Sequence, residues 1–429
     1  MDRKRLLPGD IPSVNRFVLF LTMVLSQTAL AEPPNLTLGL VNRYSDNATR
    51  VPENAEDDVE TRVTVRFDHQ TDPGACSAQT AADFGYGVWA DDSFDPETYT
   101  ELAFLGDCSL TDNLRWELAD NMQDVVQNGQ SVDTPDNRTR KNVFRTGPVV
   151  SARVSQVDLI ELSGQYEKTT FEENSDIDSD RLVGSVWLNH TFSRATELGI
   201  QFVADRAELE TDEEIDRDTL SLTFNQTWSA TRLVGSVGYS EYESRFMDTM
   251  VESDAVVGEM SLERDVSAST VFFLSASHQL TDQTAAFDVQ LGDITVDLQE
   301  TIGVEVTTVR TGLQTIYSDR SRLEIAAFLN KSDYLQTDDE EDSRGVDMNV
   351  RFPVVTRLDG LLGARLERRA FEPEDQDDTI VDVDVGLSYQ ATRKLDVIGR
   401  AGRSSRDSNF PNNEYEDNWF ELALEYRLL

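Results

Sequence analysis

Hydrophobic and polar residues alternate along most of this chain in runs of strand length. In residues 379–391 the two sets separate completely, and one set is Val381, Val383, Val385, Leu387 and Tyr389. The other set is Asp382, Asp384, Gly386 and Ser388. Because successive side chains of a strand point to opposite faces, this period of two predicts antiparallel strands with one apolar and one polar face.

From about Val154 onward, the connections between these runs alternate between two kinds. The short, similar connections are at 193–196, 229–232, 265–268, 318–321, 356–359 and 391–394. The long, acidic and dissimilar ones are at 172–180, 208–216, 246–254, 337–344, 372–378 and 406–417. A barrel in the outer membrane has short periplasmic turns and long external loops, whereas a soluble sandwich has no reason for such an alternation.

Counting the runs predicts twenty strands. They lie near 35–45, 59–69, 82–90, 97–108, 112–122, 141–154, 157–170, 180–192, 196–208, 215–229, 231–244, 254–266, 268–279, 300–318, 321–334, 344–355, 358–370, 379–391, 394–406 and 417–429. Because patterning is weak before residue 110, sixteen or eighteen strands are alternatives. The expected fold is an all-β, transmembrane, antiparallel up-and-down barrel of about twenty strands (16–20), with short periplasmic turns and long acidic extracellular loops.

Segment 279–299 is too long for a turn and falls where an external loop is due. Two interpretations stay open. The segment folds inward as a constriction of the lumen, or it forms a surface excursion or a short helix.

The N-terminus predicts export. Arg3, Lys4, Arg5 and Arg16 form a positive region, residues 17–25 are apolar, and Ala29-Leu30-Ala31 resembles a cleavage site. We expect a signal peptide over 1–31, cleaved near Ala31, and a barrel over 32–429 in the outer membrane of a Gram-negative bacterium. The sequence beyond it offers no run of about 18 apolar residues, so a membrane-spanning form must be a closed barrel.

Acidic residues outnumber basic ones by 80 to 38, for a net charge of −42. Because phosphate binding needs a basic surface, nucleic acid is excluded as a natural partner. The run from Asp338 to Asp342 offers oxygen ligands suited to Ca²⁺ or Mg²⁺, but it lacks the glycine-punctuated spacing of a dedicated loop. We expect no cofactor and no built metal site, beyond weak attraction of divalent cations.

Cys76 and Cys108 are the two cysteines of the chain. They fit an oxidising periplasm and are expected to form one disulfide at the periplasmic strand ends, with two unpaired thiols as the alternative.

Catalysis is not expected. His69, His190 and His278 are few and scattered, and Ser277 and His278 point to opposite faces because they are neighbours on a strand. No triad of nucleophile, base and orienting group is recognisable, so the chain is not expected to be an enzyme.

Charged residues at inward positions of the last strands are candidates for lining the lumen. They are Arg351, Arg365, Glu367, Arg369, Asp382, Asp384, Glu421, Glu425 and Arg427. Mixed signs on adjacent strands either fill a narrow lumen by pairing or line a polar channel, and both interpretations stay open.

The terminal strand carries Phe420, Leu422, Leu424, Tyr426 and Leu428 on one face. This pattern resembles the C-terminal insertion signal of bacterial outer-membrane proteins. The chain ends on Leu429 where that signal has Phe, so the pattern stops one residue early, at Leu428.

Three segments, 116–121, 134–138 and 142–148, carry a more specific resemblance. They read Trp-Glu-Leu-Ala-Asp-Asn, Thr-Pro-Asp-Asn-Arg and Asn-Val-Phe-Arg-Thr-Gly-Pro. The chain resembles, over roughly 35–429, a family of porin-like outer-membrane β-barrel proteins found with exopolysaccharide loci and the PEP-CTERM protein-sorting system.

The resemblance implies a polar passage or platform for exopolysaccharide export or envelope assembly, without catalytic residues. The expected partners are outer-membrane lipid and, through the resemblance, polysaccharide or export machinery, while the pattern does not set the oligomeric state. Two alternatives remain: a general diffusion porin for small solutes, and a structural or adhesive surface protein with a closed lumen.

Overall fold

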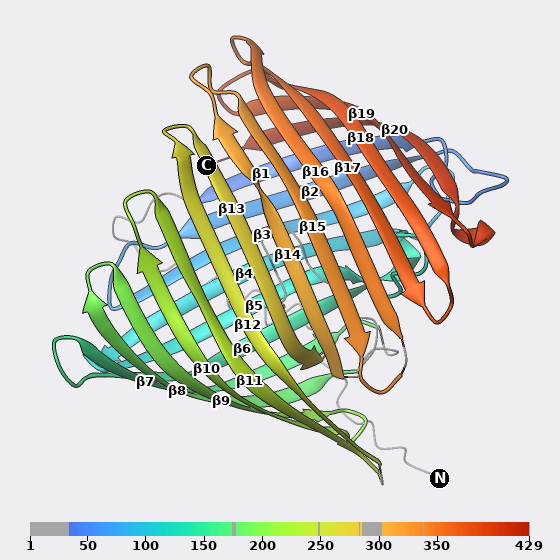
Figure 1. The fold of residues 1–429 in the computed structure, drawn as a ribbon. Coiled ribbons are helices and arrows are strands. Elements are labelled where there is room, and N and C mark those ends of the chain that lie inside the picture. Colours follow the sequence, from blue (N-terminus) through green and yellow to red (C-terminus); the bar gives the residue numbers. More distant parts are fainter. Residues whose placement is uncertain are drawn as a thin grey trace, which may run out of the picture.

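The computed structural model describes residues 34–173, 177–247, 249–282, 284, 303–337 and 339–428. The expected signal peptide, most of segment 279–299 and Asp338 lie outside these residues. Twenty antiparallel strands form one sheet that closes on itself, because β1 pairs with both β2 and β20. Figure 1 shows the strands running obliquely around the barrel.

The first ten strands are β1 (Asn35–Ser45), β2 (Asp58–Gln70), β3 (Cys76–Trp89), β4 (Glu97–Thr111), β5 (Leu114–Val126), β6 (Arg138–Arg153), β7 (Asp158–Phe171), β8 (Ser179–Ser193), β9 (Thr196–Leu209) and β10 (Glu214–Thr227). The others are β11 (Thr231–Phe246), β12 (Thr249–Ser267), β13 (Thr270–Asp282), β14 (Gly303–Ile316), β15 (Arg322–Tyr334), β16 (Glu340–Val355), β17 (Leu358–Glu372), β18 (Gln376–Gln390), β19 (Leu395–Ser408) and β20 (Tyr415–Arg427). Two 3-10 turns, Pro135–Asn137 and Pro411–Asn413, lie in connections. The predicted barrel of about twenty strands is confirmed.

The two ends of the barrel differ, as the connections predict. One end, the short-turn rim, has tight turns such as the one between β8 and β9, while the other end, the long-loop rim, carries the connections 46–57 and 127–137. Several acidic segments predicted as loops are strand instead. The connection between β11 and β12 is only 247–248, because β12 begins at Thr249.

Ion pairs explain why these acidic segments continue as strands. On the outer face, Arg245 contacts Asp216 at 2.6 Å, and Arg206 contacts the same carboxylate at 3.0 Å. Charges of opposite sign on adjacent strands support pairing, so alternating acidic residues extend the wall. The strands β9 to β12 therefore reach further at the long-loop rim than the sequence suggests.

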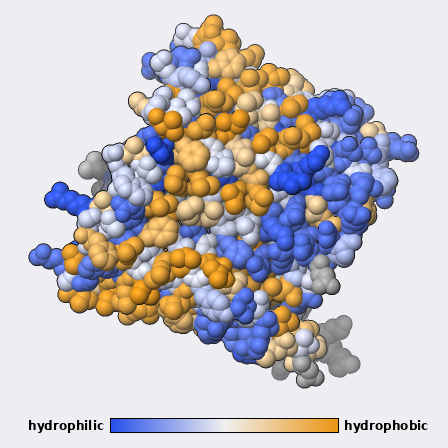
Figure 2. All heavy atoms as spheres, in the orientation of Figure 1, coloured by the Kyte–Doolittle hydropathy of each residue, from blue (hydrophilic) through white to orange (hydrophobic). Residues whose placement is uncertain are grey.

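The outer face of the barrel is apolar around its body. Leu220 and Leu222 of β10, Val383 and Val385 of β18, and Leu40 of β1 are exposed large hydrophobic side chains. Figure 2, in the same orientation, shows orange side chains over the body and blue ones gathered toward the right, where the β19–β20 connection lies. An apolar outer band with polar side chains inside is the arrangement of an outer-membrane-type barrel.

The β6 ladder to β7 has a local gap at Gly147 and Pro148. β6 itself runs through both residues, but the pairing with β7 stops at Thr146 and resumes at Val149. Proline has no donor for a ladder, and a Cβ on Gly147 would lie 2.0 Å from the Gly164 carbonyl oxygen. Glycine is required here because the backbones approach so closely.

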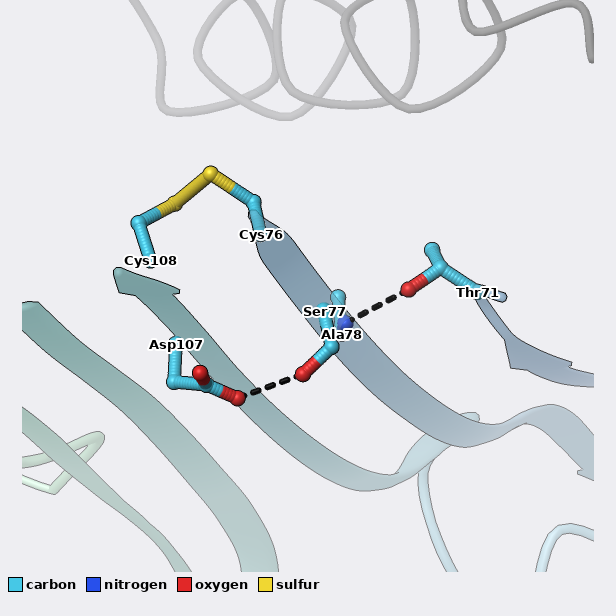
Figure 3. Close-up of a disulfide and its surroundings, with 6 residues drawn as sticks. All are labelled: Thr71, Cys76, Ser77, Ala78, Asp107 and Cys108. Carbon is cyan, nitrogen blue, oxygen red and sulfur yellow. Dashed lines mark hydrogen bonds between the residues drawn. A yellow bond between two sulfur atoms is a disulfide. The ribbon is translucent and has the colours of Figure 1, made fainter. Parts of the chain in front are cut away.

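Cys76 and Cys108 are joined in a disulfide at the short-turn rim (Figure 3). They are directly paired residues of β3 and β4. Next to the bridge, Ser77 donates a hydrogen bond to Asp107 over 2.5 Å, and the Ala78 amide donates to the Thr71 hydroxyl over 2.8 Å. The bridge and these bonds fasten the β2–β3 turn to the neighbouring strand.

Candidate functional site

All nine residues predicted to line the lumen lie on the inward face of their strands. Arg351 contacts Asp359 at 2.8 Å, and Asp384 contacts Arg400 at 2.8 Å. Four contacts of the other predicted residues are Arg365–Glu367 at 2.6 Å, Arg369–Glu367 at 2.7 Å, Glu425–Arg66 at 3.8 Å and Arg427–Asp396. Asp382 lines an internal cavity, and Glu421 pairs across the ladder with Arg43 of β1.

The predicted insertion signal lies on the opposite, outward face of β20. Phe420 is 51 % exposed, and Leu422, Leu424, Tyr426 and Leu428 are exposed with it. The apolar stripe is next to the closing seam, because β20 pairs with β1 and β19.

The β5–β6 connection, residues 127–137, crosses the lumen at the long-loop rim, and we call it the crossing loop. Its shape is fixed by Asn137, whose side-chain amide donates to the carbonyls of Asn128 at 2.8 Å and Val132 at 3.0 Å. The Asn128 amide in turn donates to the Asn137 side-chain oxygen over 3.0 Å. Side-chain bonds to backbone of this kind hold a turn that lacks a ladder.

The far end of the crossing loop is bound to the wall at β18 and β19. Arg406 of β19 donates to the Ser131 carbonyl at 2.6 Å and to the Gln130 carbonyl at 2.7 Å. The Gln130 carbonyl also accepts from Gln376 at 3.0 Å and from Asn413 at 2.8 Å. Five strands, β20 and β1 to β4, separate β19 from β5 along the wall, so these bonds span a chord of the barrel.

Arg406 is itself held by a buried carboxylate. Its guanidinium contacts Asp378 of β18 at 2.5 Å, and both side chains are almost fully buried. A buried ion pair supplemented by hydrogen bonds to carbonyls keeps a fixed geometry. Arg406 therefore joins the crossing loop to β18 and β19.

Asp133 links the crossing loop to two further arginines. Arg138 donates two hydrogen bonds, of 2.8 and 2.9 Å, to the Asp133 carboxylate. Arg50 of the β1–β2 connection donates to the Asp133 carbonyl at 2.5 Å. Burial by itself raises the pKa of Asp133, but Arg138, with the charges of Arg50 and Arg369, brings it below its usual value. This carboxylate is therefore held in its charged form.

The end of the β13–β14 hairpin also enters the lumen. β12 pairs with β13 only as far as Gly258 and His278, whereas β13 and β14 stay paired out to Asp282 and Gly303. Beyond that point β13 leaves the wall, and Leu280, Thr281 and Asp282 are buried in succession. Thr284, a described part of segment 279–299, lies against β7, because its carbonyl accepts from Thr169 at 2.8 Å.

A buried ionic cluster fastens this hairpin end to the β8–β10 wall. Arg181 contacts Asp205 at 2.7 Å and Asp282 at 2.8 Å, while Arg217 contacts Asp205 at 2.6 Å. Arg217 also donates to the Leu280 carbonyl at 2.7 Å. A small apolar core next to the cluster comprises Ala207, Leu209, Ile215, Tyr242, Ala255 and Leu280. The lumen next to β8–β10 is therefore filled by the hairpin end, the ionic cluster and the apolar core.

Among the described residues, two internal cavities lie near the crossing loop, and Arg50 and Asp133 line both. The larger cavity, of about 800 Å³, lies between the crossing loop and the wall formed by β20 and β1 to β4. Its lining carries ten carboxylates and five guanidinium groups. The smaller, of about 290 Å³, is lined by equal numbers of acidic and basic residues, Arg365, Glu367 and Asp382 among them.

The histidines lie apart from these cavities. His190 contacts Asp158 at 2.7 Å near the short-turn rim, and His278 contacts Glu305 at 3.1 Å and the Thr307 hydroxyl at 2.8 Å. Over the part of the chain that the structure describes, there is no cluster of histidine, cysteine or acidic residues that could hold a metal ion. None of the helices within the described ranges is long and apolar enough to cross a membrane.

The sequence did not predict where the crossing loop contacts the wall, nor the buried ionic clusters. Pro135 and Asn137 marked a loop, but nothing local indicated that it meets Arg406, which the pattern placed at the start of an acidic loop. The structure puts Arg406 inside β19. Arg181 and Asp205 do stand at inward positions of their strands, so alternation alone could have marked them as lumen residues.

One comparison with known proteins finds a porin family over part of the chain. Residues 341–428, from β16 through β20, match the family described as "Putative beta-barrel porin 2". Over these strands the chain is similar to that family, and it is a closed barrel of the outer-membrane type. No curated protein matches the sequence.

The solved structures that match this chain do so at low sequence identity. The siderophore receptor PirA from Pseudomonas aeruginosa has 9 % identity and a TM-score of 0.46, over 93 % of this chain and 81 % of that one. The FrpB iron transporter from Neisseria meningitidis (F3-3 variant) has 8 % identity and a TM-score of 0.47, over 93 % and 82 %.

Proposed function

We propose that this protein provides a polar passage across the outer membrane for small hydrophilic solutes, with a preference for cations. The observation that carries the proposal is the larger cavity between the crossing loop and the β20–β4 wall, with its ten carboxylates against five guanidinium groups. An aqueous cleft lined by one sign of charge raises the local concentration of oppositely charged solutes.

The arginines of this cavity are neutralised by partners, which sharpens the electrostatic preference. Arg62 contacts Glu60 at 2.7 Å, and Arg140 contacts Asp124 and Glu172, each at 3.1 Å. The Arg62 and Arg140 guanidinium groups are thus neutralised by carboxylates of the same cavity, and the remaining excess of carboxylates sets the sign of the electrostatic field there. Lumen charge of this kind tunes ion selectivity in barrels.

The two inward elements support a narrowed passage over a wide one. A barrel of 16 to 18 strands already leaves an aqueous channel, and a larger one needs a plug or inserted loops to restrict it. Here the crossing loop spans one chord of the mouth, and the β13–β14 end packs against β7 to β10. This proposal includes the first of the two interpretations of segment 279–299, in which the segment folds inward as a constriction of the lumen.

A finer proposal concerns the cargo. Association with exopolysaccharide export or envelope assembly rests on the resemblance of residues 116–148 to barrels of such loci. A polymer would have to pass the crossing loop, so this version predicts that export requires Arg406 to release it. Surface polysaccharide that is unaffected by deletion of the gene would end this version and leave a passage for small solutes.

Export by a signal peptide over 1–31 also belongs to the proposal. N-terminal sequencing of the protein from outer-membrane fractions should begin at Glu32. A mature protein that keeps residues 1–31 would contradict this step.

Planar-bilayer recording of the refolded chain tests the passage itself. We expect discrete, stepwise increases in conductance, and the same detergent without the protein should give none. A folded barrel, identified by heat-modifiable migration on gels, that gives no steps would overturn the passage and favour a structural surface protein with a closed lumen. Large, unselective steps would favour a general diffusion porin without cation preference.

A further inference from the structure

The larger cavity has aromatic side chains on a wall that is otherwise charged. Trp89 ends β3, Phe94 lies in the β3–β4 connection, and Tyr99 follows on β4. The Trp89 and Phe94 rings meet edge to face, with centroids 5.3 Å apart. Asp95 and Glu97 lie beside them in sequence and also line the cavity. Aromatic faces next to carboxylates form an environment that attracts cations.

The chain's own guanidinium groups already use this chemistry on the same wall. The Arg62 guanidinium carbon lies 3.6 Å from the centroid of the Tyr99 ring, while its nitrogens grip Glu60 at 2.9 and 2.8 Å. Arg43 lies 4.6 Å from the Trp419 ring centroid and contacts Asp417 at 4.0 Å. In both cases a planar cation is held by one aromatic face and one carboxylate.

We propose that this cavity binds a small organic cation, bearing a guanidinium or ammonium group, as the solute class that the passage recognises. The inference rests on the proposed function and deepens it. Phe94 and Trp89 supply aromatic surface, and Asp95 and Glu97 supply charge. These are the same two types of group, aromatic ring and carboxylate, that Tyr99 and Glu60 present to Arg62. A neutral sugar could stack on the same rings, but the excess of carboxylates over guanidinium groups favours a cation.

Calorimetric titration of the refolded, detergent-solubilised full chain tests this inference, with agmatine as the cationic probe and maltose as the neutral one. We expect saturable agmatine binding that weakens as salt concentration rises, because exposed charges are screened. The double variant Asp95→Asn/Glu97→Gln should weaken binding about fivefold, since exposed ion pairs contribute about 1 kcal/mol or less. Trp89→Leu should also weaken it.

The matched control is Glu252→Gln/Asp342→Asn, which removes the same charge from exposed outward positions of β12 and β16. Its agmatine affinity should equal that of the unaltered chain. Heat-modifiable migration establishes that each variant is folded. Absence of agmatine binding, an equal loss in the control, or maltose binding as tight as agmatine binding would each overturn the inference.

Conductance separates the two proposals. If the chain conducts K⁺ but does not bind agmatine, the proposed passage is supported and the proposed binding of an organic cation is contradicted. If the chain binds agmatine but does not conduct, the proposed binding site is supported and the proposed passage is contradicted.

Discussion

At the scale of single residues, Arg406 carries the largest consequence. It is 3 % exposed, pairs with the buried Asp378, and donates to two carbonyls of the crossing loop. Arg406→Ala leaves a buried charge without its main partner, which costs about 3–5 kcal/mol of unfolding free energy. We expect urea unfolding at lower denaturant and larger conductance steps, because the crossing loop loses its anchor.

Arg403→Ala is the control for Arg406→Ala. Arg403 is on the same strand, but it faces outward and contacts Glu416, and both side chains are exposed. A surface pair of this kind changes stability by about 0.5 kcal/mol or less. Equal losses in the two variants would contradict the anchoring role of Arg406.

Gly147 is the second informative residue. Gly147→Ala places a methyl group 2.0 Å from the Gly164 carbonyl oxygen, so the β6 and β7 backbones must separate. We expect a loss of about 1–3 kcal/mol, the usual cost of overpacking, measured by urea unfolding. Gly184→Ala on β8 meets nothing within 4 Å and should be nearly neutral. A harmless Gly147→Ala would mean that the close approach is not needed.

Asp133 makes the crossing loop's response to pH predictable. Its pKa is lowered in the folded state, so its contribution is present above the unfolded value and is lost as pH falls through the folded value. The unfolding free energy that Asp133 contributes, measured by urea unfolding, should therefore stay constant from neutral pH to about pH 5 and fall only below about 3.9, the ordinary value for aspartate. Asp133→Asn should abolish that acid transition, and a transition near neutral pH would contradict the assignment.

At the scale of elements, the disulfide joins two adjacent strands at the short-turn rim. Its cysteines are 32 residues apart in sequence, and a loop of that length corresponds to about 3–4 kcal/mol of stabilisation in the chain-entropy model. Cys76→Ser/Cys108→Ser should unfold at lower urea. Its conductance should match that of the unaltered chain, since the cavities lie at the other rim. Changed ion selectivity in this variant would show that the rim affects the passage.

The crossing loop shows what local sequence can and cannot reveal about elements. Pro135 and Asn137 predict a turn because their conformational preferences are local. The partner of that turn is Arg406, some 270 residues away, and no periodicity records such a contact. The acidic segment before Asp254 became part of β12 for a similar reason, since ion pairs to neighbouring strands overrode the loop-like composition.

At the scale of the whole molecule, the barrel, its closure and its inward charges could be predicted from the period of two and the alternating connections. Those features follow from each strand needing one apolar and one polar face. The filling of the lumen did not follow, because Asp282 comes from β13, several strands away along the wall from Arg181 on β8 and Asp205 on β9. Whether inward charges pair or face water depends on which residues meet across the lumen.

The central claim is a cation-preferring passage bounded by the crossing loop. Its most direct test is the reversal potential of the refolded chain in a planar bilayer under a KCl gradient, compared with Asp95→Asn/Glu97→Gln. We expect a reversal potential shifted toward that of K⁺, and a smaller shift in the variant. No measurable current, or a reversal potential on the chloride side, would contradict the claim.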